Sequence, residues 1–87
     1  MAEEVKIHGV YRHYKGNLYI VEGFGRHSET GEKLVLYRAL YGDNELWCRP
    51  YDMFLEEVNK NGQKLRFERQ VIEEVKDNSG HGTRSVL

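Results

Sequence analysis

The stretch LVLYRALY, residues 34–41, decides the fold class because its side chains alternate between two sets of positions. One set holds Val35, Tyr37, Ala39 and Tyr41. A spacing of two places successive side chains on opposite faces of a β-strand, whereas an amphipathic helix repeats every three or four residues. Residues 18–21, LYIV, alternate in the same way. We therefore predict two strands of an all-β domain.

Turn-forming residues separate these strands from three further ones. The turn signals occupy residues 15–17, 28–32, 42–44 and 59–62. The sharpest is Asn61-Gly62, because both residues tolerate the positive φ of a type I′ hairpin turn. We expect strands near residues 8–14, 18–27, 33–41, 45–50 and 64–69, joined as a small antiparallel barrel. In the second strand, Gly23 and Gly25 permit sharp coiling, a bulge or the close approach of another backbone, and we expect a bend of the barrel.

One short helical turn is expected near residues 51–57, directly after Pro50. Tyr51, Phe54, Leu55 and Val58 follow the spacing of one helix face, and such a turn caps an open end of a barrel. From about residue 77 the sequence has no apolar periodicity, so we expect a mobile tail there. The predicted organisation is one β-barrel domain over residues 7–70 and a C-terminal extension over residues 71–87.

Composition restricts the chain to one small globular domain. Its 87 residues are 39% hydrophobic and 31% charged, with a net charge of −1. A single cysteine, Cys48, excludes an internal disulfide, and we interpret it as a small core residue. The N-terminus lacks a basic segment followed by an apolar one, and no apolar run reaches about 18 residues. We therefore expect a cytoplasmic protein without membrane contact.

Several multi-residue phrases resemble one bacterial family, domain of unknown function 1653. They are Gly9-x-Tyr11-Arg12-His13-Tyr14-Lys15-Gly16, Tyr19-x-Val21, His27-Ser28-Glu29-Thr30, Val35-x-Tyr37, Leu40-Tyr41 and Trp47-x-Arg49-Pro50-x-x-Met53-Phe54. The resemblance covers residues 7–68. It implies a mostly bacterial, stand-alone barrel similar to the Src-homology-3 type, and it implies no reaction.

The candidate ligand-binding surface centres on Trp47 and Arg49. Alternation places both side chains on one strand face, and a guanidinium beside an indole can hold a base, an aromatic side chain or a carboxylate. Tyr41, Arg12 and His27 are further candidates around them. The same residues could instead pack in the core or at its rim. We predict a non-enzymatic recognition module that binds a peptide, a protein or a nucleic acid.

Two alternatives remain open at this point. A small enzyme or small-molecule-binding protein would use His27 and Glu29, although no motif in the chain names a reaction and Ser28 lacks a glycine-rich elbow. A structural or oligomerisation domain would use exposed strand edges, and we expect a monomer or a weak homodimer. His8 and His13 fall on opposite faces of a strand, so no metal site is predicted, and no cofactor is expected.

Overall fold

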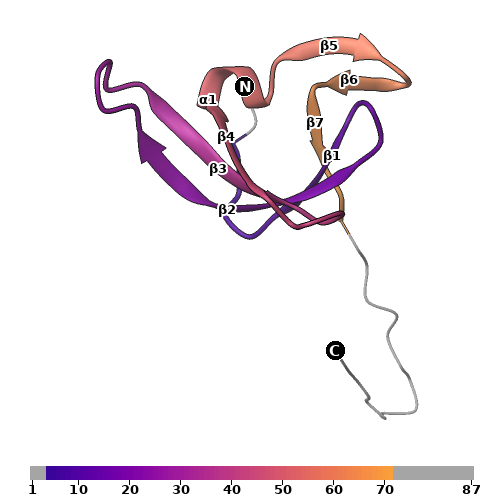
Figure 1. Cartoon of the computed structure of the whole chain (residues 1–87). Coiled ribbons are helices and arrows are strands. Elements are labelled where there is room, and N and C mark those ends of the chain that lie inside the picture. Colours follow the sequence, from indigo (N-terminus) through magenta and orange to yellow (C-terminus); the bar gives the residue numbers. More distant parts are fainter. Residues whose placement is uncertain (1–3, 72–87) are drawn as a thin grey trace, which may run out of the picture.

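The computed structural model of the chain describes residues 4–71, which form one strongly bent antiparallel sheet, a short helix and a hairpin (Figure 1). The elements are β1 (Val10–His13), β2 (Leu18–Arg26), β3 (Lys33–Ala39), β4 (Leu46–Pro50), α1 (Tyr51–Phe54), β5 (Glu57–Lys60), β6 (Gln63–Leu65) and β7 (Phe67–Arg69). The five-stranded sheet has the order β4-β3-β2-β1-β7, and β5 and β6 form a separate two-stranded sheet. The prediction of an all-β domain with one short helix is confirmed.

The sheet is not closed into a barrel, so this part of the prediction is wrong. β4 and β7 are its two edges, and within residues 4–71 they do not pair with each other. The segment expected as one strand over residues 64–69 is divided at Arg66. Its first half pairs with β5 and its second half pairs with β1, so neither half is left to reach β4.

The helix is also shorter than expected. It ends at Phe54, and the chain becomes extended again at Glu57, so residues 57–60 form a strand. The cause is the predicted turn, in which Asn61 and Gly62 have φ angles of 51° and 78°. This turn pairs the residues before it with those after it, and the pairing outweighs the helical spacing of residues 51–58.

A β-bulge interrupts β2. The pairing of β2 with β3 shifts by one residue between Val21 and Gly23. Val21 pairs with Tyr37 and Phe24 pairs with Val35. Because directly paired residues point to the same side of a sheet, both Val21 and Phe24 lie on the concave face despite their odd spacing. Of the features that these glycines permit, the structure thus shows a bulge, whereas the expected use is a bend of a closed barrel.

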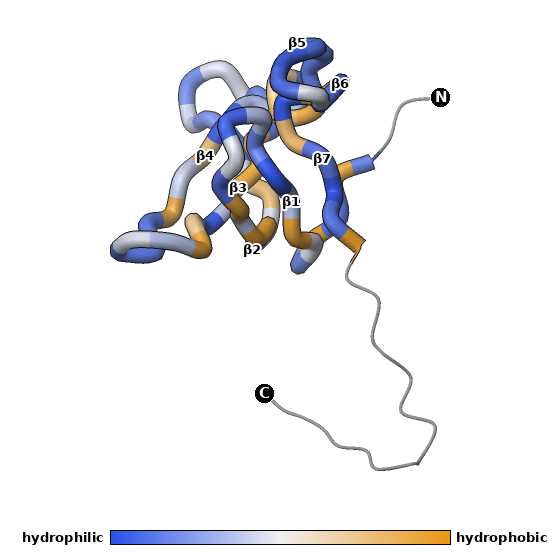
Figure 2. The backbone as a smooth tube through the Cα atoms, turned by 90° about the vertical axis from the view of Figure 1, so that its right-hand side faces the viewer, coloured by the Kyte–Doolittle hydropathy of each residue, from blue (hydrophilic) through white to orange (hydrophobic). Residues whose placement is uncertain are grey.

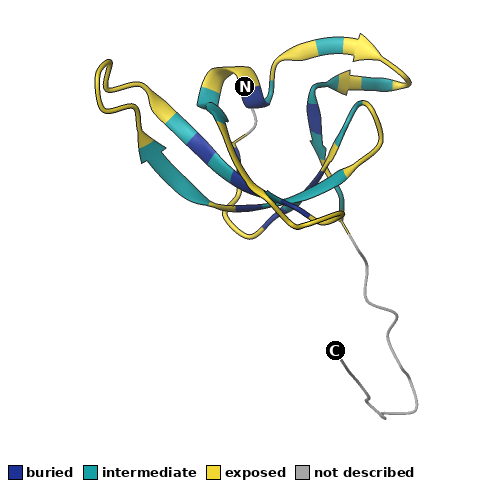
Figure 3. Ribbon diagram, viewed as in Figure 1, coloured by how far each residue is buried: buried dark blue, intermediate teal, exposed yellow. Residues whose placement is uncertain are grey.

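The core lies between the concave face of the sheet and α1 (Figure 3). Phe54 from α1 stacks on Phe67 from β7, with ring centroids 4.1 Å apart and planes only 3° from parallel. Tyr11 and Tyr37 meet the Phe54 ring edge-on. These aromatic contacts explain why a helix of only four residues is enough to cover the core on the concave face of the sheet.

The convex face of the sheet carries the other set of alternating residues. Cys48 pairs with Leu36 on this face and is exposed, so the expectation of a buried cysteine is wrong. Leu46, two residues earlier on the same face, is 49% exposed. Figure 2 shows that the β5–β6 hairpin is mostly hydrophilic, whereas hydrophobic stretches gather in the sheet.

Within the described range, no helix is long and apolar enough to span a membrane. The predicted C-terminal extension from residue 72 onward, including the tail expected to be mobile from about residue 77, lies outside the described residues.

Candidate functional site

Trp47 and Arg49 project from β4 onto the concave face of the sheet. Trp47 pairs with Tyr37 and Arg49 pairs with Val35, and both partners are buried on that face. The predicted common face is therefore confirmed. Yet Trp47 is 47% exposed, because α1 covers the concave face at the other end of β4. Within residues 4–71 its ring contacts no other aromatic ring, and its indole N–H has no hydrogen-bond partner.

Tyr41 lies across from Trp47 and is held in place by a second tyrosine. The hydroxyls of Tyr19 and Tyr41 are 2.7 Å apart, and the two rings meet edge-to-face with centroids separated by 5.5 Å. Burial and this hydrogen bond raise the pKa of Tyr19 well above its usual range, so its hydroxyl stays protonated. The pair therefore offers a fixed aromatic wall.

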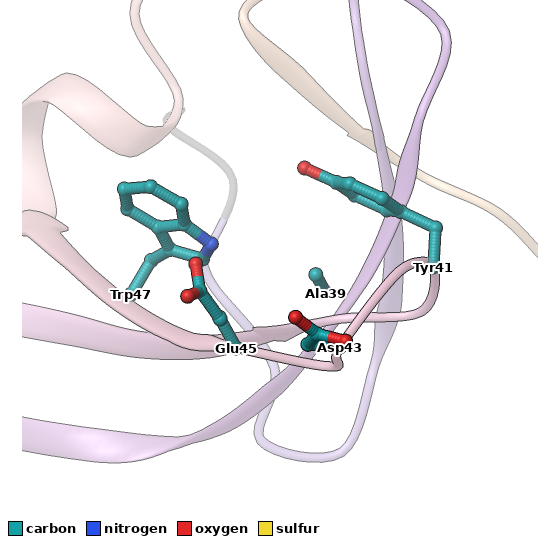
Figure 4. Close-up of a pocket in the computed structure, with 5 residues that line it drawn as sticks. All are labelled: Ala39, Tyr41, Asp43, Glu45 and Trp47. Carbon is teal, nitrogen blue, oxygen red and sulfur yellow. The ribbon is translucent and has the colours of Figure 1, made fainter.

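Trp47 and Tyr41 stand on opposite sides of a pocket of about 180 Å³ (Figure 4). Ala39 lies between them, and the carboxylates of Asp43 and Glu45 complete the lining. Neither acid is among the site residues predicted from the sequence, because the segment Gly42-Asp43-Asn44 predicts only a turn. The signal that could have found them is their position in the short segment between Tyr41 and Trp47, two of the predicted site residues.

The turn between β3 and β4 holds these acids in a defined position. Asn44 has a positive φ of 54°, and its side-chain amide donates a hydrogen bond to the Ala39 carbonyl at 2.9 Å. The Arg38 guanidinium donates to the Asn44 carbonyl, also at 2.9 Å. The Ala39 amide donates to the Glu45 carbonyl. The backbone is thus anchored on both sides of Asp43.

Arg49 extends the site toward β7. Its Nε donates a long hydrogen bond of 3.4 Å to the Tyr37 hydroxyl, and its guanidinium carbon lies 5.9 Å from the centroid of the Phe67 ring. Among residues 4–71 no carboxylate forms an ion pair with it. A half-buried guanidinium with so few partners is available to an incoming carboxylate or carbonyl.

His13 shares this face, because it pairs with the buried Phe67, although it was not among the residues predicted for the site. Its ring meets Phe67 edge-on at 4.9 Å and stacks on Tyr14 at 4.4 Å. Burial lowers the pKa of His13, and the positive charges of Arg49, Arg66 and Lys15 lower it further. His13 is therefore a neutral ring near pH 7. The signal was its two-residue spacing from Tyr11.

Arg12 lies on the opposite face from Trp47, which corrects its predicted place beside that residue. It pairs with Leu18 and is exposed, whereas its neighbour Tyr11 is buried on the concave side. The error arose from choosing the wrong set of alternating residues in the first strand.

His27 and Glu29 lie in the β2–β3 turn, away from Trp47. The Nδ1 atom of His27 accepts hydrogen bonds from the backbone amides of Glu29 and Thr30, at 3.1 and 3.4 Å. These bonds stabilise the turn itself. Along the strands, His27 and Trp47 are separated by roughly 15 Å. Of the predicted residues, the structure thus brings together Trp47, Arg49 and Tyr41, and it leaves Arg12, His27 and Glu29 elsewhere.

Metal ligands do not gather in the part of the chain that the structure describes. No group of three or more His, Cys, Asp or Glu side chains there is arranged to hold a metal ion.

Comparison with known proteins relates this chain to one family. A crystal structure of a DUF1653 protein from Bordetella bronchiseptica superposes with a TM-score of 0.62 and is 33% identical in sequence. The match covers 79% of this chain and 90% of that chain. A search of curated proteins finds no match. The family model described as "Protein of unknown function (DUF1653)" matches residues 9–69. The chain therefore belongs to the DUF1653 family.

Proposed function

We propose that this protein is a non-enzymatic recognition module that binds an extended peptide segment of a partner at the concave face beside β4. The observation that carries the proposal is the exposed ring of Trp47 above an open pocket, next to a strand whose outer edge is unpaired within residues 4–71. A side chain of this kind, placed beside an available strand edge, is typical of peptide-binding surfaces.

The unpaired edge of β4 can accept a further strand. An added strand forms main-chain hydrogen bonds with the edge, and every second side chain then points to the concave face. Those side chains would lie beside Trp47 and Arg49, which point to the same face. The fold thus supplies main-chain affinity and side-chain selectivity at one place.

Burial of the indole supplies a useful part of the binding free energy. A tryptophan side chain has roughly 200 Å² of surface, and Trp47 leaves 47% exposed, which is about 100 Å². Covering this area contributes about 2.5 kcal/mol at about 25 cal/mol per Å². That is a substantial share of the roughly 8 kcal/mol of a micromolar complex.

The electrostatics favour a peptide over a nucleic acid. Asp43 and Glu45 line the pocket and would repel phosphate groups, and the net charge of the chain is −1. Arg12, a candidate phosphate contact, lies on the other face of the sheet. Binding of single-stranded nucleic acid thus becomes an outcome that the experiment tests.

A small-molecule or enzymatic role has weaker support. The pocket between Trp47 and Tyr41 measures about 180 Å³, below the roughly 300 Å³ at which small-molecule sites begin. A larger depression of about 370 Å³ is lined by Asn59, Gly62, Gln63 and Lys64 of the hairpin. It is broadly open and has no aromatic lining. The Nδ1 atom of His27 is engaged in its turn, where it accepts a hydrogen bond from the backbone amide of Glu29.

An oligomerisation role is favoured by one separate feature, the convex face. Leu46 and Cys48 lie two residues apart on β4, so both are on this face, and both are exposed. Analytical ultracentrifugation across a wide concentration range tests this role. A dimer that Leu46→Asp dissociates would establish it.

The proposal includes a setting in the reducing cytosol of a bacterial cell. The single cysteine and the bacterial source of the related structure support this setting. The strong bend of the sheet, together with the short helix that directly follows β4, supports the likeness to Src-homology-3 domains.

Selection from a displayed library of random decapeptides tests the recognition function. We expect the intact chain to enrich a peptide family, and Trp47→Ala to lose about 2.5 kcal/mol of its binding free energy. Leu46→Ala is the matched control, because Leu46 is on the same strand and 49% exposed but points to the convex face.

Two outcomes would contradict the recognition function as proposed. Either the library yields no enriched peptide, or Trp47→Ala and Leu46→Ala bind the enriched peptides as well as the intact chain does. Tight binding of single-stranded oligonucleotides in a parallel salt titration would instead favour the nucleic-acid role.

A further inference from the structure

We infer that the pocket between Trp47 and Tyr41 takes a basic side chain, lysine or arginine, of the bound peptide. This inference rests on the proposed recognition function and adds the chemical class of one anchor residue. Its support comes from the rings, the uncompensated acids, a similar arrangement elsewhere in the chain, and the rigidity of the pocket.

The rings provide the first part of the attraction. Trp47 and Tyr41 are 47% and 41% exposed and stand on opposite sides of the pocket (Figure 4). A cation placed near the face of an aromatic ring is attracted by the negative potential of that face, and indole is the strongest of the natural rings. A long basic side chain also buries its methylene groups against such walls.

The acids of the pocket lack a positive partner. Within residues 4–71, neither Asp43 nor Glu45 forms an ion pair with a lysine or an arginine. Arg38, the basic residue nearest to the turn in sequence, forms its ion pair with Glu22 at 2.9 Å and also donates to the Asn44 carbonyl. A cation from a partner would therefore meet two carboxylates that the chain has left uncompensated.

The chain uses the same ring chemistry at the other end of the concave face. The Lys33 ammonium lies 4.6 Å from the Phe24 ring centroid and 4.5 Å from the Tyr51 ring centroid. There, two aromatic rings from separate elements hold a cation that belongs to the chain itself. The pocket between Trp47 and Tyr41 also has two aromatic walls, and it contains two carboxylates in addition. No basic side chain of the described residues lines it.

Tyr41 and the turn that carries the acids are fixed before a ligand arrives. The hydrogen bond to Tyr19 fixes Tyr41, and the Asn44 amide fixes the turn that carries the acids. Pre-ordered walls reduce the entropy lost on binding. The volume of about 180 Å³ suits one side chain rather than a drug-sized ligand.

Intrinsic fluorescence gives a direct test, because Trp47 is the single tryptophan of the chain. The intact chain is titrated with N-acetyl-arginine amide, N-acetyl-lysine amide and the uncharged isostere N-acetyl-citrulline amide at constant ionic strength. We expect both cations to shift the emission at about tenfold lower concentration than citrulline. The double variant Asp43→Asn, Glu45→Gln should reduce this difference to about twofold or less.

The matched control changes net charge equally at distant positions. Glu4→Gln combined with Glu32→Gln also removes two carboxylates, and it should leave the preference for arginine over citrulline unchanged. This control separates a local effect of the pocket from the overall charge of the protein.

Failure of this inference and failure of the recognition function give different results. Equal responses to arginine and citrulline, or a preference that survives Asp43→Asn with Glu45→Gln, would overturn the cation pocket. Trp47-dependent capture of peptides from the library would then still support recognition. Conversely, a cation preference without any enriched peptide would retain the pocket and refute the peptide function.

Discussion

Replacing Arg49 with alanine distinguishes a binding residue from a structural one. In the folded protein its guanidinium makes one long hydrogen bond to the Tyr37 hydroxyl and lies 5.9 Å from the Phe67 ring centroid. A hydrogen bond of average length contributes about 1 kcal/mol, and a half-exposed contact between a cation and a ring contributes about 0.5–1 kcal/mol. Because the hydrogen bond is long, we expect a total loss of about 1 kcal/mol.

This loss should lower the midpoint of thermal unfolding by about 4–8 °C, as measured by circular dichroism. Binding of the peptides selected from the library should fall by about tenfold, which corresponds to a charge-assisted hydrogen bond. Arg12→Ala is the matched control, because it removes the same charge from the convex face. It should change neither quantity appreciably.

A nuclear magnetic resonance titration of His13 provides a further measurement on the same variant. The Arg49 charge is one of the causes that lower the pKa of His13, and burial is the largest. The pKa of His13 should therefore rise in Arg49→Ala but stay below its ordinary value. A loss of more than about 3 kcal/mol of folding free energy would refute this reasoning, because only a buried, fully paired charge costs that much to remove. Equal binding by Arg49→Ala and Arg12→Ala would refute it as well.

Two further predictions concern stability. Gly9→Ala should cost about 1–3 kcal/mol in urea unfolding, because an added Cβ would lie 3.0 Å from the Lys6 carbonyl oxygen and 3.0 Å from a ring carbon of the buried Tyr11. Gly25→Ala is its control, since the nearest atom there is 3.8 Å away, and equal losses would contradict the close approach. Because the pKa of His13 is lowered in the folded protein, the unfolded chain binds more protons just below pH 6.5. The free energy of unfolding should therefore decrease, and the protein become less stable, as the pH falls from about 6.5 toward the folded-state pKa. His13→Gln should flatten this decrease in urea titrations between pH 7 and 5, and an unchanged slope would show that other groups cause it.

The strands were predictable where every second residue is buried and apolar. Val35, Tyr37 and Ala39 are at most 4% exposed, and this pattern is visible directly in the sequence. The turn at Asn61-Gly62 was predictable from backbone preference alone, and its positive φ angles agree. Local physics thus determines most elements of this fold.

Whether the sheet closes into a barrel was not predictable, because closure depends on which strands pair with the short segment before the C-terminus of the domain. Residues 64–69 contain Lys, Arg and Glu and only two apolar residues, Leu65 and Phe67, and their division between β5 and β1 follows from the competing turn at Asn61. Periodicity within one strand carries no information on that choice.

The candidate site was predictable only in part, for a related reason. Alternation correctly placed Trp47 and Arg49 on one face, but it could not say which parity of the first strand joins that face. Arg12 was therefore misplaced and His13 was overlooked. Asp43 and Glu45 became visible only when the β3–β4 turn was placed beside Trp47.

The bulge in β2 also affects how this strand tolerates changes of length. A one-residue deletion in a regular strand exchanges the two faces for every residue beyond it. Here Glu22 is the extra residue between two stretches that are each in register with β3. Its removal would join them into an uninterrupted ladder and leave Tyr19, Val21 and Phe24 on their present face. Deletion of Gly23 would have the same result, because Glu22 would then lie opposite Leu36. A one-residue deletion in β3, which has no extra residue, would instead move the residues beyond it to the opposite face, so the bulge is the part of the sheet that tolerates the loss of one residue.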